Sequence, residues 1–173
     1  MSSLIEYQQP ASTWASAALV LGVSSSLLVS GIQLGAIHTV PLLYTLPVDT
    51  STQLFSKVHR GSAKTSAPIA AFSATAFAVS AYLFAGGEAR FNIVLAHAAG
   101  LILSSLLWTR LAMKGVTRAL LDNTSNQVKL ADEMDQATMK RLLRKWKWMS
   151  LFKGGLTFGG GLIGLIALAT RTT

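Results

Sequence analysis

The chain contains no cysteine among its 173 residues. Disulfides, thiolate metal sites, cysteine nucleophiles and thiol redox relays are therefore excluded. Charge is also scarce, because only 13% of the residues are charged while 51% are hydrophobic. Uncharged runs of roughly 20 residues recur, which is the length that a helix needs to cross a hydrocarbon core. The composition predicts a polytopic membrane protein, and since the runs are far longer than barrel strands, we expect the spans to be α-helices.

Four apolar stretches predict a single all-α membrane domain over residues 1–173, folded as a four-helix bundle. The expected spans are about 12–40, 68–86, 91–111 and 149–169. Glu6 precedes the first span and no Lys or Arg does, so the positive region of a cleaved signal peptide is missing and we expect this helix to be retained. Pro41 is expected to end or kink it.

The stretch 55–68 is the only strongly polar interruption in the first half of the chain. Around its start, Leu54, Phe55 and Val58 recur at helical spacing, which predicts a short helix lying on the membrane surface after the first span. Gly61 is expected to let the chain turn. Pro68 suits the first turn of the second span, where its missing amide hydrogen is not needed.

The segment between the third and fourth spans begins with a polar connector, 113–135, that is expected to form turns. From about Gln136 a basic amphipathic helix is expected, with Trp146 and Trp148 as interfacial anchors. Its apolar positions recur every three or four residues: Met139, Leu142, Leu143 and Trp146. Anionic lipid, and not nucleic acid, is the expected partner of this basic surface.

Basic residues also predict the orientation of the chain. Between spans one and two lie Lys57, Arg60 and Lys64. Between or beside spans three and four lie Arg110, Lys114, Arg118, Lys129, Lys140, Arg141, Arg144, Lys145, Lys147 and Lys153. Only Arg90 and Arg171 fall on the other side. By the positive-inside bias, both basic loops are expected in the cytosol and both termini in the lumen or outside.

Two of the three histidines lie in predicted spans. His38 shares a helical face with Gly31 and Gly35, and His97 shares one with Ser104. Small residues favour close helix contacts, so both faces are expected to point into the bundle. His38 is either a packed histidine or a functional one. The two histidines are expected about 20 Å apart along the bundle, too far to bind one metal ion, and we predict no metal site.

The remaining polar candidates lie toward the expected cytosolic side. His59 and Arg60 either face solvent and lipid phosphates or belong to a site. Lys153 enters the fourth span on a face shared with Thr157 and Gly160. Its ammonium group either reaches the headgroups or projects into a polar cavity.

The order of these features resembles the anthrone oxygenase family of small four-helix membrane proteins, found in fungal aromatic polyketide pathways. The resemblance covers nearly the whole chain and depends on an uncharged first helix followed by Pro41, Phe55, Gly61, Pro68, Asn126, Trp146 and Lys153. It implies oxidation of an anthrone to an anthraquinone by molecular oxygen, without an organic cofactor or metal. It also implies the endoplasmic reticulum as the location.

Such a reaction needs a base, a cation near the developing oxyanion and a dry aromatic pocket. His59 or His38 is the expected base, and Arg60 and Lys153 are expected to stabilise the phenolate or the superoxide. The expected ligand is a flat, hydrophobic aromatic molecule that arrives from the membrane or its cytosolic face. Candidate substrate-binding residues are Phe55, Asn126, Trp108, Trp146 and His97.

Two other classes of protein fit the same features. A related membrane enzyme of secondary metabolism would catalyse cyclisation or dehydration without oxygen. A non-catalytic scaffold or binding protein would use the same basic helix and small-residue faces and would need no histidine. Those faces serve contacts either within one bundle or between copies in a homo-oligomer.

Overall fold

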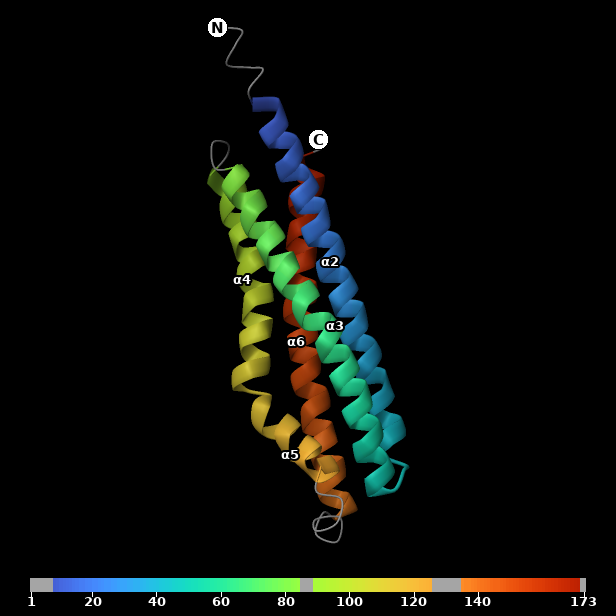
Figure 1. Cartoon of the computed structure of the whole chain (residues 1–173). Helices are drawn as coiled ribbons and strands as arrows, with labels where there is room; N and C mark the ends of the chain where they lie inside the picture. Colours follow the sequence, from blue (N-terminus) through green and yellow to red (C-terminus); the bar gives the residue numbers. More distant parts are fainter. Residues whose placement is uncertain (1–7, 85–88, 126–134, 172–173) are drawn as a thin grey trace, which may run out of the picture.

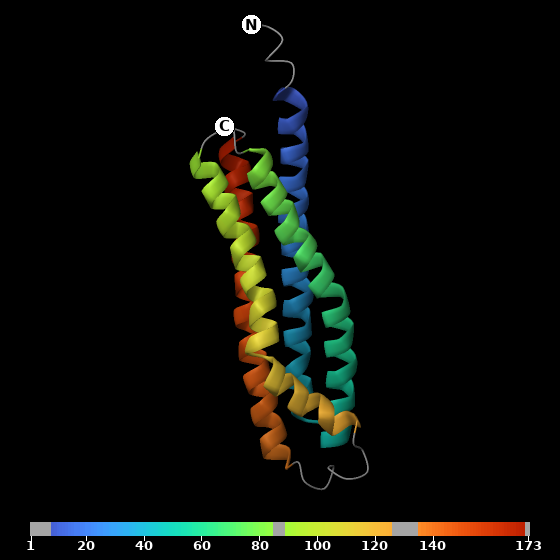
Figure 2. The same cartoon turned by 60° about the vertical axis from the view of Figure 1, so that its left-hand side comes forward.

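The computed structural model describes residues 8–84, 89–125 and 135–171. These residues form helices α2 (Gln8–Leu43), α3 (Val48–Leu83), α4 (Ala89–Leu111), α5 (Lys114–Ser125) and α6 (Gln136–Arg171), and the described part of the chain contains no strand. The four long helices run side by side as a bundle, with the start of α2 and the end of α6 at the same end (Figure 1). The short helix α5 lies across the opposite end (Figure 2).

Four helices are long and apolar enough to cross a membrane, within Thr13–Leu43, Val48–Leu83, Arg90–Leu111 and Gln136–Thr170. The predicted all-helical bundle with four spans is therefore confirmed. Pro41 lies inside the last turn of α2, which ends two residues later, as expected.

The predicted surface helices are helical, but neither is a separate element. Residues 51–59 belong to the continuous helix α3, so Gly61 makes no turn and Pro68 lies inside the helix. The basic segment from Gln136 continues without a break into the fourth span as α6. The expected turns after Met113 were also wrong in part, because the connector begins with α5.

Small side chains bring α6 close to its neighbours. A Cβ added at Gly160 would lie 2.9 Å from the Ala98 carbonyl oxygen of α4, and one at Gly161 would lie 2.5 Å from Ser26 Oγ of α2. One at Gly164 would collide with the ring of Phe77, which is fully buried. Glycine at these positions therefore permits helix contacts that any side chain would prevent.

Serine hydroxyls connect α2 and α3 inside the bundle. Ser73 of α3 donates to the Gly22 carbonyl of α2 at 2.7 Å, and Ser80 of α3 donates to the Ala15 carbonyl at 2.9 Å. Each bond satisfies a buried hydroxyl and fixes the register of α2 against α3.

The apolar core is divided into two clusters. The cluster nearer the termini is built around Leu19, Phe77, Leu95 and Ile102. The other, near α5, is built around Val40, Phe55, Leu120, Leu143 and Trp146. Polar side chains, including buried Gln33, lie on the helix turns between them. A polar layer inside a membrane bundle is costly and is the first place to look for function.

The expected inward face of α2 was wrong. Gly31, Gly35 and His38 are exposed, and a Cβ added at either glycine would meet nothing within 4 Å. The face that packs into the bundle carries Ser30, Gln33, Ile37 and Val40 instead. Because lipid is as apolar as leucine, small residues on a span mark a close contact only where a partner helix is present.

Candidate functional site

Three rings from α3 and α6 form the centre of the candidate site. Phe55 and His59 lie one turn apart on α3 and stack with centroids 5.6 Å apart and planes inclined by 7°. Trp146 of α6 meets both edge-on, with centroids 5.1 Å from Phe55 and 6.0 Å from His59. Phe55 and Trp146 are buried and His59 is half-buried, so the imidazole has one side on an aromatic wall and remains accessible.

Two cations act electrostatically on this histidine, Lys153 of α6 and the adjacent Arg60 of α3. Lys153 is half-buried within the bundle, whereas Arg60 is exposed. The structure thus places His59, Phe55 and Trp146 in contact and Lys153 within electrostatic range of His59, and all four are candidate site residues from the sequence. An imidazole with an ammonium group within electrostatic range can accept a proton while the cation stabilises the negative charge left behind.

The other nominated residues are dispersed. Trp108 of α4 lies at the edge of the cluster, where its Nε1–H donates to the Met149 carbonyl at 3.3 Å and its ring lies 4.7 Å from Phe152. His38 is exposed on the outer side of α2. Asn126 lies outside the described residues.

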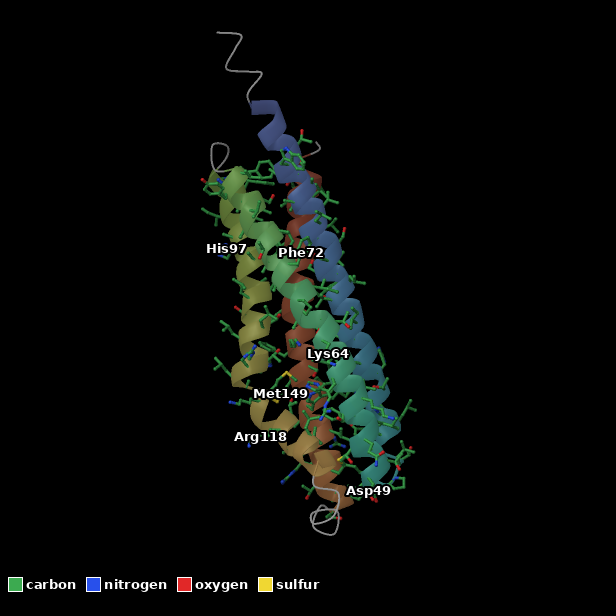
Figure 3. The ribbon with its side chains drawn as sticks, in the orientation of Figure 1. Asp49, Lys64, Phe72, His97, Arg118 and Met149 are labelled. Carbon is green, nitrogen blue, oxygen red and sulfur yellow. The ribbon has the colours of Figure 1, made fainter. Side chains whose placement is uncertain are left out.

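His97 does not face the bundle interior, which corrects the expectation for its helix face. It is exposed on α4, its Nδ1 lies 2.7 Å from the Ile93 carbonyl oxygen, and it lines an open surface groove with Gly100 and Ser104. Figure 3 shows His97 in the half of the bundle nearer the termini, and Asp49 and Lys64, which bracket His59 on α3, in the other half.

Sequence reasoning missed Gln33. Its side chain is 4% exposed, and neither its amide oxygen nor its amide nitrogen has a hydrogen-bond partner among the described residues. It lies on the α2 face that packs against Gly154, next to Lys153 on α6. The sequence contained a pattern that marks this face, since Gln33 continues the three- and four-residue spacing of Ser26 and Ser30. The expected inward face of α2 was instead assigned from Gly31 and Gly35, which lie on the exposed side.

The site lies where α4 ends. The last turn of α4 is level with Met149 and Phe152 of α6, through the contacts of Trp108. His59 packs against Trp146, one turn of α6 away from Met149. α4 has 23 residues, about 35 Å at 1.5 Å per residue, whereas the 36 residues of α3 extend about 54 Å. A hydrocarbon core is about 30 Å thick, so a membrane-spanning α4 has its two ends near the two membrane surfaces. The site lies at the level of one end of α4 and is therefore near one membrane surface.

No group of three or more His, Cys, Asp or Glu side chains that could hold a metal ion occurs within residues 8–84, 89–125 and 135–171. The polar groups of the candidate site are an imidazole, an ammonium group, an indole and a carboxamide, from His59, Lys153, Trp146 and Gln33. Such groups bind and polarise an organic molecule that carries oxygen atoms.

The fold and the site together define a helical membrane protein with a histidine and cation cluster at one end of its spans. The model of the anthrone oxygenase family matches residues 55–163, well over half of the chain and the whole of the α3 and α6 parts of the site. The chain therefore belongs to the anthrone oxygenase family. No curated protein and no solved structure shows significant similarity to it.

Proposed function

We propose that the protein oxidises an anthrone-type polyketide to the corresponding anthraquinone with molecular oxygen. The observations that carry the proposal are the half-buried His59, whose ring stacks on Phe55 and meets Trp146 edge-on, and the electrostatic influence of Lys153 on this histidine, all within the region matched by the family. The fused rings of the substrate lie against Phe55 and Trp146, and the methylene carbon of its central ring faces His59.

His59 begins the reaction by taking one proton from this methylene carbon, and the electron pair left behind spreads onto the ring oxygen as a phenolate. The electron-rich anion reduces oxygen directly, and a new carbon–oxygen bond forms to give a peroxide. Loss of the second carbon-bound proton then breaks the oxygen–oxygen bond. One oxygen atom stays as the ketone, and the other leaves as hydroxide and takes up a proton to become water.

In this proposal, Lys153 stabilises the phenolate and the superoxide, and Arg60 supports it from the accessible side. Charges oriented toward a developing anion stabilise it most where protein and ligand shield it from bulk water. His38 is assigned no role as a base, because it points away from this cluster. The proposal assigns oxygen as the co-substrate and neither an organic cofactor nor a metal.

The location of the site also suits a flat, lipid-soluble substrate. Trp108 and Phe152 border the cluster at the level where α4 ends, so the ligand arrives from the bilayer or its surface. We place this end in the cytosol, against an anionic leaflet, because the basic residues of α3, α5 and the start of α6 lie there. The endoplasmic reticulum is the proposed membrane.

The test is oxygen uptake and quinone absorbance with purified protein in detergent and a simple anthrone, measured against spontaneous oxidation. The proposal requires acceleration that persists after treatment with a chelator. Acceleration lost on chelation would require a metal and contradict the assigned chemistry. No acceleration would favour a cyclase or dehydratase that uses another substrate, or a scaffold.

A further inference from the structure

One inward-facing position of α2 carries a side chain that its surroundings do not satisfy. Ser26, Ser30, Gln33, Ile37 and Val40 recur every three or four residues, and all five are buried. The two serine hydroxyls donate to carbonyl groups of their own helix at 2.8 and 2.9 Å. The carboxamide of Gln33 has no such partner among the described residues, for its nitrogen or for its oxygen.

A buried amide without partners destabilises a folded protein, because it loses its hydrogen bonds to water and gains none. An apolar residue at this position would avoid that loss. The unpaired amide therefore indicates a molecule from outside the chain that supplies the missing donor and acceptor.

The surroundings of Gln33 connect it to the candidate site. A Cβ added at Gly154 of α6 would lie 3.6 Å from Gln33 Oε1, so the amide oxygen faces the helix turn that begins with Lys153. A second buried group, Trp146 Nε1, also has no hydrogen-bond partner in the part of the chain that the structure describes. Its ring packs against His59. One unpaired group therefore lies against the residue after Lys153, and the other belongs to the ring that packs against His59.

The chemistry of these groups defines the ligand. The amide both donates and accepts, which suits a hydroxyl group, and the indole only donates, which suits a carbonyl or ionised oxygen. Trp146 and Gly154 are eight residues apart on α6, a rise of about 12 Å. A single ligand that reaches both groups is therefore elongated and carries oxygen at two separated positions.

We propose that Gln33 is a specificity-determining residue that binds a phenolic hydroxyl on the outer ring of a fused-ring ketone, while Trp146 donates to an oxygen at the other end. The identity of the ring system rests on the proposed function, whereas the preference for a hydroxyl rests on the unpaired amide. Gln33 lies outside the matched residues 55–163, so this preference is a property of the first helix of this chain.

The test is equilibrium binding in detergent, followed by quenching of tryptophan fluorescence, with two ligands that need no turnover. One is unsubstituted anthraquinone, and the other carries hydroxyl groups on its outer rings. Gln33→Met keeps the length of the side chain and removes both hydrogen-bonding groups. Ser30→Ala is the matched control, because it changes a buried polar residue on the same face whose hydroxyl is already paired.

We expect the wild type and Ser30→Ala to bind the hydroxylated ligand roughly tenfold more tightly than the unsubstituted one, and Gln33→Met to lose this preference. The proposal is overturned if Gln33→Met keeps the preference or if the wild type has none. A rise in melting temperature for Gln33→Met with the preference unchanged would also overturn it, because the amide would then be only a structural cost. A hydroxyl preference without oxygen uptake would support this assignment and contradict the proposed reaction.

Discussion

The role of His59 can be separated from its packing, because the structure shows which ring contacts a substitution would remove. His59→Phe keeps a flat ring against Phe55 and Trp146 and removes both nitrogen atoms. His59→Ala removes the ring as well. Since an aromatic pair contributes about 0.5–1.5 kcal/mol beyond its buried area, loss of two pairs should cost about 1–3 kcal/mol of the free energy of unfolding.

Turnover should respond differently from stability. Removing a general base lowers the rate roughly 100-fold or more, so both variants should lose at least that factor while only His59→Ala melts at a lower temperature. The assay is the initial rate of oxygen uptake and of quinone formation after subtraction of spontaneous oxidation, together with thermal unfolding in the same detergent. His38→Phe, on the outer side of α2, should stay within about threefold of the wild type, because it removes no base from the cluster.

One result would refute this reasoning directly. If His59→Phe turned over substrate within about threefold of the wild type at an unchanged melting temperature, no proton transfer by His59 would limit the reaction. A large loss in His38→Phe without a loss in His59→Phe would transfer the role of the base to His38.

Three further outcomes are expected. Lys153→Met should lower turnover roughly tenfold or more with little change in melting temperature, because the positive charge stabilises the oxyanion. Lys153→Arg keeps the charge and should therefore retain part of the turnover that Lys153→Met loses, and equal rates in both variants would contradict this role. Gly164→Ala should reduce the free energy of unfolding by about 1–3 kcal/mol, because the added methyl group overpacks against a buried phenylalanine ring. Gly155→Ala is the control and should leave the free energy of unfolding unchanged, because its methyl group would meet nothing within 4 Å. Equal melting temperatures for the two variants would refute the close contact at Gly164. Because the chain has no cysteine, Asp49→Cys and Thr170→Cys each introduce a single site that an impermeant maleimide can label in sealed vesicles. We expect the cysteine at position 49 to react from the cytosolic side and the cysteine at position 170 to react from the opposite side. The reverse pattern would invert the proposed orientation.

Much of the site could be predicted from the sequence. Phe55 and His59 are four residues apart, so a helix places them on one face whatever the rest of the chain does. Trp146 and Lys153 are two turns apart and share a face of the fourth span for the same reason. The long uncharged runs imposed a helical bundle, because in lipid only helices of that length satisfy their own backbone.

The rotation of α2 was decided only by tertiary packing. In a soluble protein, the apolar face of a helix marks the core, but a span is apolar on the lipid side as well, so its sequence does not distinguish the two faces. Contacts with α3 and α6 turned Gln33 inward and His38 outward. The sequence also could not separate a helix lying on the membrane from a span extended beyond it, since both present the same polar face to water.

The sequence by itself therefore determined the class of protein, the number of spans and the side chains available for chemistry, because these follow from local composition and helical periodicity. Only the tertiary structure decided that the imidazole from α3 packs against an indole of α6, within electrostatic range of an ammonium group of the same helix, and that an unpaired amide from α2 faces the residue after that lysine. This arrangement depends on how three helices rotate and slide against one another. Close contacts at glycine and serine fix that arrangement, and the partners in those contacts are far apart in the chain.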